Sequence, residues 1–392
     1  MKMKTSVLAA TLLAALAMPA AAQEAYRIGG VVSLTGPVGS VGVSFQRGSE
    51  VAIDMHKNRT VLGKPVIVLW EDDETKAQVS AQKGAKLAAQ NLDMMLGSIT
   101  TASTLPVMKI TEQRKIPHII TLGGGDSITG ADRTAYAWRT TVPLGMEDLA
   151  LVAYVKDAKF KSMYHVGFGF QVNKDRWANF EKLVPTQTST KLAGVSFSPV
   201  ENTDFALIIE AILRSGADAV SLDLPGTVAT SFLKQAAQVG LEKKLKIFGT
   251  VLVDDETAKA VGPSAIGLTT GTRWHWTFDN APSKAFVAAY KKKYNGELPD
   301  MYAGEAFDGL AWWLDVVEKT GSWDKEKQLA AFSNSVWTQS LKGKKTMRAC
   351  DHQATQNAYW AEIVKGPSDA QPYTLKVTHT FPPEQVFPPC TK

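Results

Sequence analysis

Strand-like and helix-like segments alternate along most of the chain, and this alternation constrains the fold more than any other feature. Residues 26–34 form a β-like apolar run, residues 35–42 are rich in turn formers, and residues 45–56 have helical periodicity. Alternation of this kind is typical of a parallel sheet covered by helices on both faces. The sequence therefore predicts an α/β fold.

The alternation runs through two blocks, which meet near Val142 and Pro143. In the first block we expect further elements at 66–70, 76–90, 94–96, 106–113 and 118–122. In the second we expect them at 148–156, 163–167, 175–183, 205–215, 219–222, 228–239, 246–250, 285–293, 307–320 and 359–364. With 392 residues the chain is long enough for two domains. Two such sheets predict two lobes, with a ligand cleft at the carboxyl ends of their strands.

The first 22 residues have the composition of a secretory signal. Lys2 and Lys4 precede an apolar run over residues 7–18, and Ala20, Ala21 and Ala22 supply small residues for a cleavage site. The run is shorter than the ~20 residues that span a bilayer, so we expect cleavage rather than a membrane anchor. Because no cysteine stands at the cleavage point, we expect a freely diffusing periplasmic protein.

Charge and motif content exclude several classes of function. The net charge of +5 falls to +3 when Lys2 and Lys4 are removed, which is too small an excess to favour a nucleic-acid partner. The sequence contains no GxSxG, HExxH, P-loop or CxxC motif, and its six histidines are scattered. A periplasmic location also argues against ATP- or NAD-dependent metabolism. We expect no catalytic residues and no cofactor.

Cys350 and Cys390 are the two cysteines of the chain. In an oxidising compartment such a pair most simply forms a disulfide, which here would hold the proline-rich tail over residues 380–392. Two alternatives stay open, namely two free thiols or a metal site with the neighbouring Asp351 and His352. No second ligand cluster has matching spacing, so we expect no metal.

Three short stretches invite more than one interpretation. The hydroxyl-rich turn at 97–104 lies before an expected helix and would hold a carboxylate, although it could equally be a helix cap without a ligand. Three glycines at 123–125 lack the spacing of a phosphate loop, and we interpret them as a tight turn near a ligand. The acidic run at 71–74 lacks the pattern of a calcium loop and is more typical of a solvated strand end.

Motifs in collinear order along the mature chain carry a family resemblance. They are Arg-Ile-Gly-Gly-Val-Val-Ser-Leu-Thr-Gly-Pro at 27–37, the loop at 97–106, and Phe-Val-Ala-Ala-Tyr-Lys at 286–291 ahead of Phe307, Asp308 and Gly309. In these motifs the chain resembles the periplasmic solute-binding proteins of ABC importers, of the leucine/isoleucine/valine-binding type. Each motif alone is weak, and their order makes the resemblance specific.

The resemblance implies a type I periplasmic-binding fold, in which two lobes joined by three crossings close on a small ligand without chemistry. By position the crossings fall near 141–144, 268–272 and 353–358. The signal peptide is then 1–22, the first lobe comprises 23–142 and 271–354, and the second comprises 143–270 and 355–392.

The resemblance also implies which residues bind the ligand. Thr101 matches the family's hydroxyl for the ligand carboxylate, and Ser98 and Ser103 lie in the same loop. The next loop falls on Gly123 and Gly124, which would offer backbone N–H groups. Aromatic side chains are expected to hold the organic body of the ligand, namely Phe170, Trp274 and Tyr302, with Phe168 beside them. Trp274 alternates with Trp276 at strand spacing, and such a pair packs more often in a core.

The second lobe departs from the family pattern. Where amino-acid binders carry a glutamate for the ligand ammonium, the matching stretch at 248–251 reads Phe-Gly-Thr-Val, with no carboxylate until Asp254. Where they carry a tyrosine, this chain has Leu-Pro-Gly at 224–226. Thr250 and Leu224 are the candidate site residues of these stretches. Because a buried ammonium without a counter-charge is costly, these changes favour an aromatic or other amine-free carboxylate. A branched-chain amino acid stays the alternative ligand.

The sequence therefore predicts a monomeric periplasmic protein that captures a small carboxylate by lobe closure. Its expected partners are an inner-membrane ABC permease and the ATPase of that permease. Two alternatives stay open. One is a ligand sensor of the same fold that feeds a receptor or a dehydrogenase system. The other is a secreted enzyme, against which the missing nucleophile, base and metal sets argue.

Overall fold

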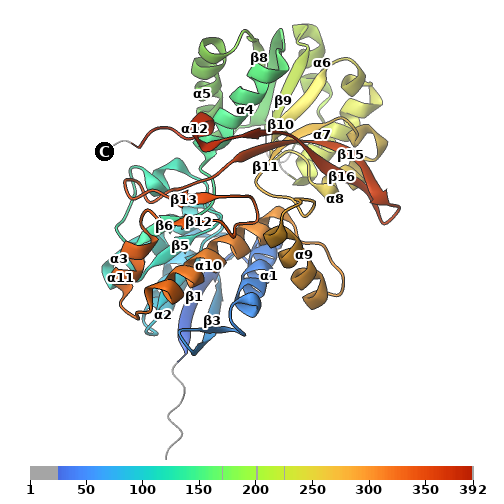
Figure 1. Cartoon of the computed structure of the whole chain (residues 1–392). Coiled ribbons are helices and arrows are strands. Elements are labelled where there is room, and N and C mark those ends of the chain that lie inside the picture. Colours follow the sequence, from blue (N-terminus) through green and yellow to red (C-terminus); the bar gives the residue numbers. More distant parts are fainter. Residues whose placement is uncertain (1–24, 170, 200–201, 225, 391–392) are drawn as a thin grey trace, which may run out of the picture.

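The computed structural model describes residues 25–390 except 170, 200–201 and 225, and it has two lobes, each built on its own sheet (Figure 1). The predicted signal peptide lies outside the described residues. Both sheets are mainly parallel and flanked by helices, so the expected two-lobed α/β fold is confirmed.

The sheet of the first lobe has six strands in the order β2-β3-β1-β4-β5-β6. Their bounds are β1 Tyr26–Val32, β2 Thr60–Val61, β3 Lys64–Asp72, β4 Met94–Gly97, β5 His118–Ile120 and β6 Ala137–Arg139. The strands from β3 to β6 pair in parallel, and the central ones are buried along their length. Continuous apolar strands of this kind require cover on both faces.

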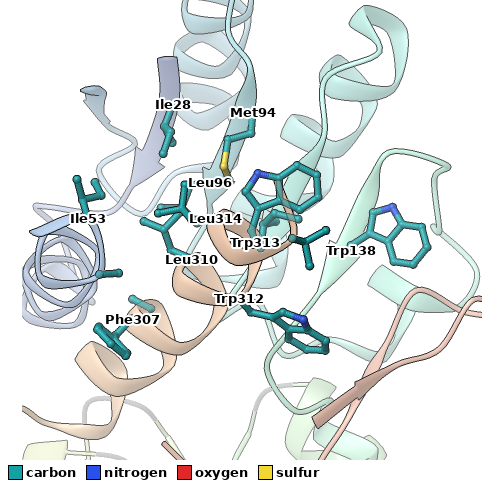
Figure 2. Packing of buried hydrophobic residues seen from close by; sticks show 14 of the residues in the cluster. Ile28, Ile53, Met94, Leu96, Trp138, Phe307, Leu310, Trp312, Trp313 and Leu314 are labelled. Carbon is teal, nitrogen blue, oxygen red and sulfur yellow. The ribbon is translucent and has the colours of Figure 1, made fainter. Parts of the chain in front are cut away.

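Helices provide that cover in the first lobe. Their bounds are α1 Gly39–Met55, α2 Ala77–Ala88, α3 Thr101–Arg114, α9 Ala281–Lys293, α10 Met301–Thr320 and α11 Lys325–Phe332. On one face α10 packs Leu310, Trp313 and Leu314 toward Ile28 and Leu96 of the sheet (Figure 2). On the other face the cluster around Leu87 and Val107 joins α2 and α3 to the sheet.

The sheet of the second lobe has seven strands in the order β16-β15-β11-β10-β9-β7-β8. Their bounds are β7 Ser162–Phe168, β8 Lys191–Ser198, β9 Ala219–Asp223, β10 Lys246–Thr250, β11 Thr269–Thr272, β15 Ala358–Ser368 and β16 Gln371–Phe381. The flanking helices are α4 Leu144–Ala158, α5 Gln171–Gln187, α6 Ala206–Ser215, α7 Gly226–Gln238, α8 Asp255–Val261 and α12 Pro383–Val386. The β15–β16 hairpin, which helical or parallel-strand patterns do not predict, forms one edge of the sheet.

The chain passes between the lobes three times, after β6, after β11 and before β15. The second passage differs from the expectation at 268–272, because Thr269–Thr272 is the strand β11 and pairs with both β10 and β15. A small third sheet, with β12 Val336–Trp337, β13 Lys345–Met347 and β14 Ala354–Thr355, precedes the last passage. The exact residue limits of the lobes stay a prediction.

Several helices begin earlier than their apolar periodicity indicates. The helix expected at 106–113 starts at Thr101, because the Thr100 side chain accepts the Ser103 N–H at 3.1 Å and caps it. The hydroxyl run therefore belongs to the first turn of α3, and Pro106 lies inside the helix. In the same way Asn280 and Asp300 cap α9 and α10 upstream of the expected starts.

The carboxyl-terminal tail carries the predicted disulfide between Cys350 and Cys390, whose Cα atoms are 6.1 Å apart. Because the two sulfur atoms are bonded to each other, neither free thiols nor a thiolate metal site is present there. Proline does not exclude all regular structure from the tail, since β16 extends to Phe381 and Pro383 starts the single turn α12.

No helix among the described residues is long and apolar enough to cross a membrane.

Candidate ligand site between the lobes

The candidate site lies where the carboxyl ends of strands from both sheets come together. The loop after β5 meets the start of α4 in a hydrogen bond from the Leu144 N–H to the Gly124 carbonyl, at 2.9 Å. The side chain of Arg273, which follows β11, approaches the same loop, since a Cβ on Gly124 would lie 3.8 Å from its guanidinium. The two lobes thus meet at Gly124.

Thr101 lies at the start of α3, beside the glycine loop. Its Oγ1 accepts the Gly125 N–H at 2.9 Å, which leaves its own hydroxyl proton to donate elsewhere. The first turn of a helix also favours negative charge. Thr101 and the glycine loop are therefore brought together as the sequence predicts.

Ser98 and Ser103, the other predicted hydroxyls of this loop, are fully buried. Ser98 donates to Asp73 at 2.6 Å, and Asp73 also accepts the Ser33 hydroxyl at 2.6 Å. The Ser103 hydroxyl has no hydrogen-bond partner, and its carbonyl accepts from Ser80. Part of the acidic run at 71–74 thus positions the loops around Thr101 instead of ending in solvent.

Arg139 forms hydrogen bonds to the glycine loop at 123–125. It is fully buried at the end of β6, and its Nη1 donates to the carbonyl oxygens of Gly123 at 3.3 Å and Gly125 at 2.6 Å. Its Nε donates to Gln353 at 2.5 Å, and its Nη2 donates to Thr129 at 2.7 Å. All four acceptors are neutral oxygens.

A second buried arginine, Arg176, lies at the edge of the site that the second lobe forms. Arg176 of α5 bonds Asp148 at 2.6 Å, Asp223 at 2.9 Å and Glu147 at 3.5 Å. Burial opposes its charge, but the three carboxylates outweigh burial and raise the pKa of Arg176. In turn burial raises the pKa of Asp148 to about 6, against the opposing effect of Arg176.

Thr250, a predicted site residue at the end of β10, belongs to this second cluster. Its hydroxyl accepts from Nη1 of Arg176 at 3.0 Å. A guanidinium therefore contacts the stretch at 248–251, which the family resemblance matches to the glutamate of amino-acid binders.

Arg273 joins this cluster to the first lobe. It bonds Glu147 at 2.8 Å, and this carboxylate raises the pKa of Arg273 although burial opposes the charge. Tyr302, a predicted site residue at the start of α10, interacts electrostatically with Arg273. Burial raises the pKa of Tyr302 to about 12, so the phenol is neutral and can donate a hydrogen bond.

Two of the predicted site residues lie in the hydrophobic cores. Trp274 is fully buried in the first lobe, where it lies against Gly304 and donates to Ser283 at 2.8 Å. Leu224 is buried in the core of the second lobe, as is Phe168. The remaining aromatic candidate, Phe170, lies outside the described residues.

A small cavity lies beside the passages between the lobes. It has a volume of about 30 Å³ and lies between α4, the ends of β10 and β11, and the start of β15. Glu147, Thr250 and Arg273 supply polar lining, and the other walls are mostly apolar, formed by side chains such as Val142, Met146 and Trp360. The cavity is much smaller than the ~300–1,000 Å³ of typical ligand pockets, and Thr101, Gly123, Gly124 and Tyr302 do not line it.

The sequence prediction missed the arginines that organise this site, although one signal was present. Arg139 ends a short apolar strand, where a charged side chain is unusual. Its partner Gln353 lies 214 residues away, so only the fold reveals the contact.

Comparison with known proteins agrees with this architecture. A family model described as periplasmic binding protein matches residues 25–368. A Leu/Ile/Val-binding protein homolog of Brucella melitensis is 25% identical over 392 residues, covering 97% of both chains.

Two solved structures share the fold along nearly their whole length. An ABC transporter substrate-binding protein from Sphaerobacter thermophilus superposes with a TM-score of 0.85 at 22% identity, covering 92% of this chain and 98% of its own. A solute-binding protein of an ABC transporter from Rhodopseudomonas palustris, in complex with 3,4-dihydroxybenzoic acid, gives 0.81 at 24% identity with the same coverage. Since the family model covers most of the sequence, the chain belongs to the periplasmic binding protein family, whose members bind ligands and are not enzymes.

Proposed function

We propose that this solute-binding protein captures a small organic carboxylate without an amino group. In this proposal the first lobe holds the carboxylate, through the Thr101 hydroxyl and the N–H groups of the glycine loop at Gly123 and Gly124. Tyr302 contacts the organic body. An aromatic acid is the ligand class that fits best.

The observation that carries the proposal is the contact between Thr250 and Arg176. A ligand ammonium in the place used by amino-acid binders would face this guanidinium, and like charges at such a distance repel. Thr250 itself supplies no negative charge.

The carboxylates around the second cluster do not offer a substitute. Glu147, Asp148 and Asp223 are all bonded to arginines, and Asp255 accepts from Trp276 at 2.6 Å and contacts His275 at 3.1 Å. Recruiting one of them for an ammonium would require breaking a buried ion pair or hydrogen bond. An amine-free acid makes no such demand.

The names of the similar proteins include both ligand classes. The Rhodopseudomonas palustris protein is in complex with an aromatic acid, whereas the Brucella melitensis relative is named for branched-chain amino acids. The pairing of the acidic side chains in this chain favours the aromatic acid.

Binding without bond making is sufficient for this function. Because Gly124 belongs to the first lobe and Arg273 follows a strand of the second, a ligand between them gains contacts from both lobes only when they are close. Such differential contact shifts the population of open and closed forms. We propose that the closed, loaded form is recognised by an inner-membrane ABC permease, after secretion with cleavage near Ala22, and that the protein acts as a monomer.

A thermal-shift screen tests the ligand class. Ligand-free protein is heated with benzoate, 4-hydroxybenzoate, 3,4-dihydroxybenzoate, short aliphatic acids, leucine, isoleucine and valine. A ligand at 100 times its Kd stabilises the fold by about 2.7 kcal/mol. We expect the aromatic acids to raise Tm and the amino acids to leave it unchanged. Stabilisation by the amino acids alone would overturn the proposal.

A further inference from the structure

Arg139 is a buried cation whose charge has no bonded counter-ion. Its side chain is fully buried, and among the described residues no carboxylate lies within ion-pair distance of it. The nearest acidic groups that influence it, Asp126 and Asp351, do so only through longer-range attraction. Burial lowers the pKa of Arg139 to about 10. An uncompensated buried charge is costly, so an anion that approached it would be stabilised.

The hydrogen bonds of Arg139 also fix how the glycine loop is oriented. In a trans peptide the C=O and N–H groups point in opposite directions. Because the Gly123 carbonyl points toward Arg139, the N–H of Gly124 points away from it. The Gly125 carbonyl also points toward Arg139, so the N–H of Asp126 is turned away in the same manner.

We take the side of the loop that faces away from Arg139 as the cleft side, because Gly124 lies where the two lobes meet. There Gly124 is half-buried, with Leu144 and Arg273 as the neighbours that a Cβ would meet, at 3.5 and 3.8 Å. The intervening N–H, that of Gly125, is already bonded to Thr101. The N–H groups of Gly124 and Asp126 thus point to the side of the loop opposite Arg139, and the Thr101 hydroxyl lies beside the loop.

We propose that Arg139 is a positioning residue for the ligand carboxylate, which aims the N–H groups of Gly124 and Asp126 into the cleft and supplies a buried positive charge behind them. This inference rests on the proposed function, because it requires a carboxylate ligand. Under this inference the N–H groups that donate to the carboxylate are those of Gly124 and Asp126. Arg139 fixes the orientation of the peptide groups that carry them.

Arg139 also connects this loop to the passages between the lobes. Its partner Gln353 donates to the Thr141 carbonyl at 2.7 Å and to the Ala354 carbonyl at 2.7 Å. Thr141 lies in the first passage, and Ala354 lies in β14 just before the third. A ligand that displaces the loop therefore acts on a hydrogen-bond chain that ends at both passages.

The test compares an acid with its primary amide, which has nearly the same shape but no charge. The probes are 4-hydroxybenzoate and 4-methylpentanoate with their amides, measured by calorimetry on wild type, Arg139→Met and Arg139→Lys. Arg214→Met, an exposed arginine of α6 paired with Glu210, is the matched control.

We expect wild type to prefer the acid over the amide, and Arg139→Met to reduce that preference at least tenfold. Arg139→Lys should retain part of the preference, because it keeps the charge but loses the planar fork. Arg214→Met should equal wild type. If Arg139→Met weakens acid and amide by the same factor, the role of Arg139 is merely structural and the inference is wrong.

A second measurement keeps the inference testable if Arg139→Met fails to fold. In wild-type protein labelled with [15N]glycine, the Gly124 amide signal is assigned by its loss in Gly124→Ala, where the added Cβ makes ordinary contacts at 3.5 Å. We expect this signal to move downfield with the acid and less with the amide. A bound acid that leaves the signal unmoved would overturn the inference alone, whereas wild type that binds no acid would overturn the proposed function and this inference together.

Discussion

The two edges of the ligand site each contain a buried arginine, but the two arginines have opposite surroundings. Arg176 in the second lobe is bonded to three carboxylates, whereas Arg139 in the first lobe is bonded only to neutral oxygens. The negative charge around Arg176 is therefore already paired, whereas Arg139 has no carboxylate bonded to it. The difference favours the first lobe for a ligand's negative group, and the acids bonded to Arg176 are not free to pair with an amine.

The largest effect expected from this comparison is on folding stability. Arg176→Met leaves Asp148 and Asp223 without their guanidinium partner and should cost about 3–5 kcal/mol. Arg139→Met leaves neutral acceptors unsatisfied and should cost about 1–3 kcal/mol in ligand-free protein. Urea denaturation of both variants measures which substitution lowers the free energy of unfolding more. An equal or reversed order would show that the two environments do not differ in charge balance as described.

The next expected effect concerns the disulfide between Cys350 and Cys390, which helps to hold the two lobes together. The tail that carries Cys390 leaves α12 on the second lobe, whereas Cys350 is anchored to the first lobe by neighbours such as His352, whose carbonyl accepts the Arg139 N–H at 2.9 Å. Replacing both cysteines by serine should lower the free energy of unfolding by about 3–4 kcal/mol. Reduction of wild type should reproduce the loss of Tm. An unchanged Tm would mean that Arg348, which donates to the Pro388 carbonyl at 2.8 Å, holds the tail alone.

A smaller effect is expected from substitution of Thr101, which lies in the first lobe. Thr101→Ala should weaken binding of the acid by about 1.5–3 kcal/mol if the hydroxyl donates to its carboxylate. Thr101→Ser is the matched control, because it keeps the hydroxyl and should bind nearly as wild type. Calorimetry that finds equal affinity for the alanine and serine variants would remove Thr101 from the site.

The smallest effect concerns pH and two fully buried histidines, His118 in the first lobe and His165 in the second. Burial lowers the pKa of His118 and of His165 to about 4, against about 6.5 in the unfolded chain. A depressed folded pKa means that the neutral ring stabilises the fold above about pH 6.5, and that this contribution is lost as pH falls toward 4. His165→Gln should reduce the slope of unfolding free energy over this range by up to about 1.4 kcal/mol per pH unit. An unchanged slope would contradict the burial of a neutral ring.

The sequence predicted the architecture well, because alternating periodicity reports on which faces are buried. It placed the starts of α3, α9 and α10 too late, since their caps Thr100, Asn280 and Asp300 lie before the apolar repeat begins. It predicted part of β15, at 359–364, but not its partner β16, because a strand at a sheet edge has a weaker apolar signal.

The candidate site was predicted in part. Thr101 and the glycine loop come together because both follow neighbouring strands of one parallel sheet, which a pattern can indicate. Trp274 could not be separated from a core residue, since strand spacing does not say which face meets solvent. The arginine clusters depend on partners far away in sequence, and no local pattern encodes them.

The most direct test of the central claim removes only the amine from a ligand. Leucine and 4-methylpentanoate share one carbon skeleton and one carboxylate, and phenylalanine and 3-phenylpropanoate form a second such pair. Calorimetry on ligand-free protein should give tighter binding of the amine-free acid in both pairs, by at least tenfold. Tighter binding of leucine or phenylalanine would contradict the account, because it would require a free negative charge for the ammonium beside Arg176.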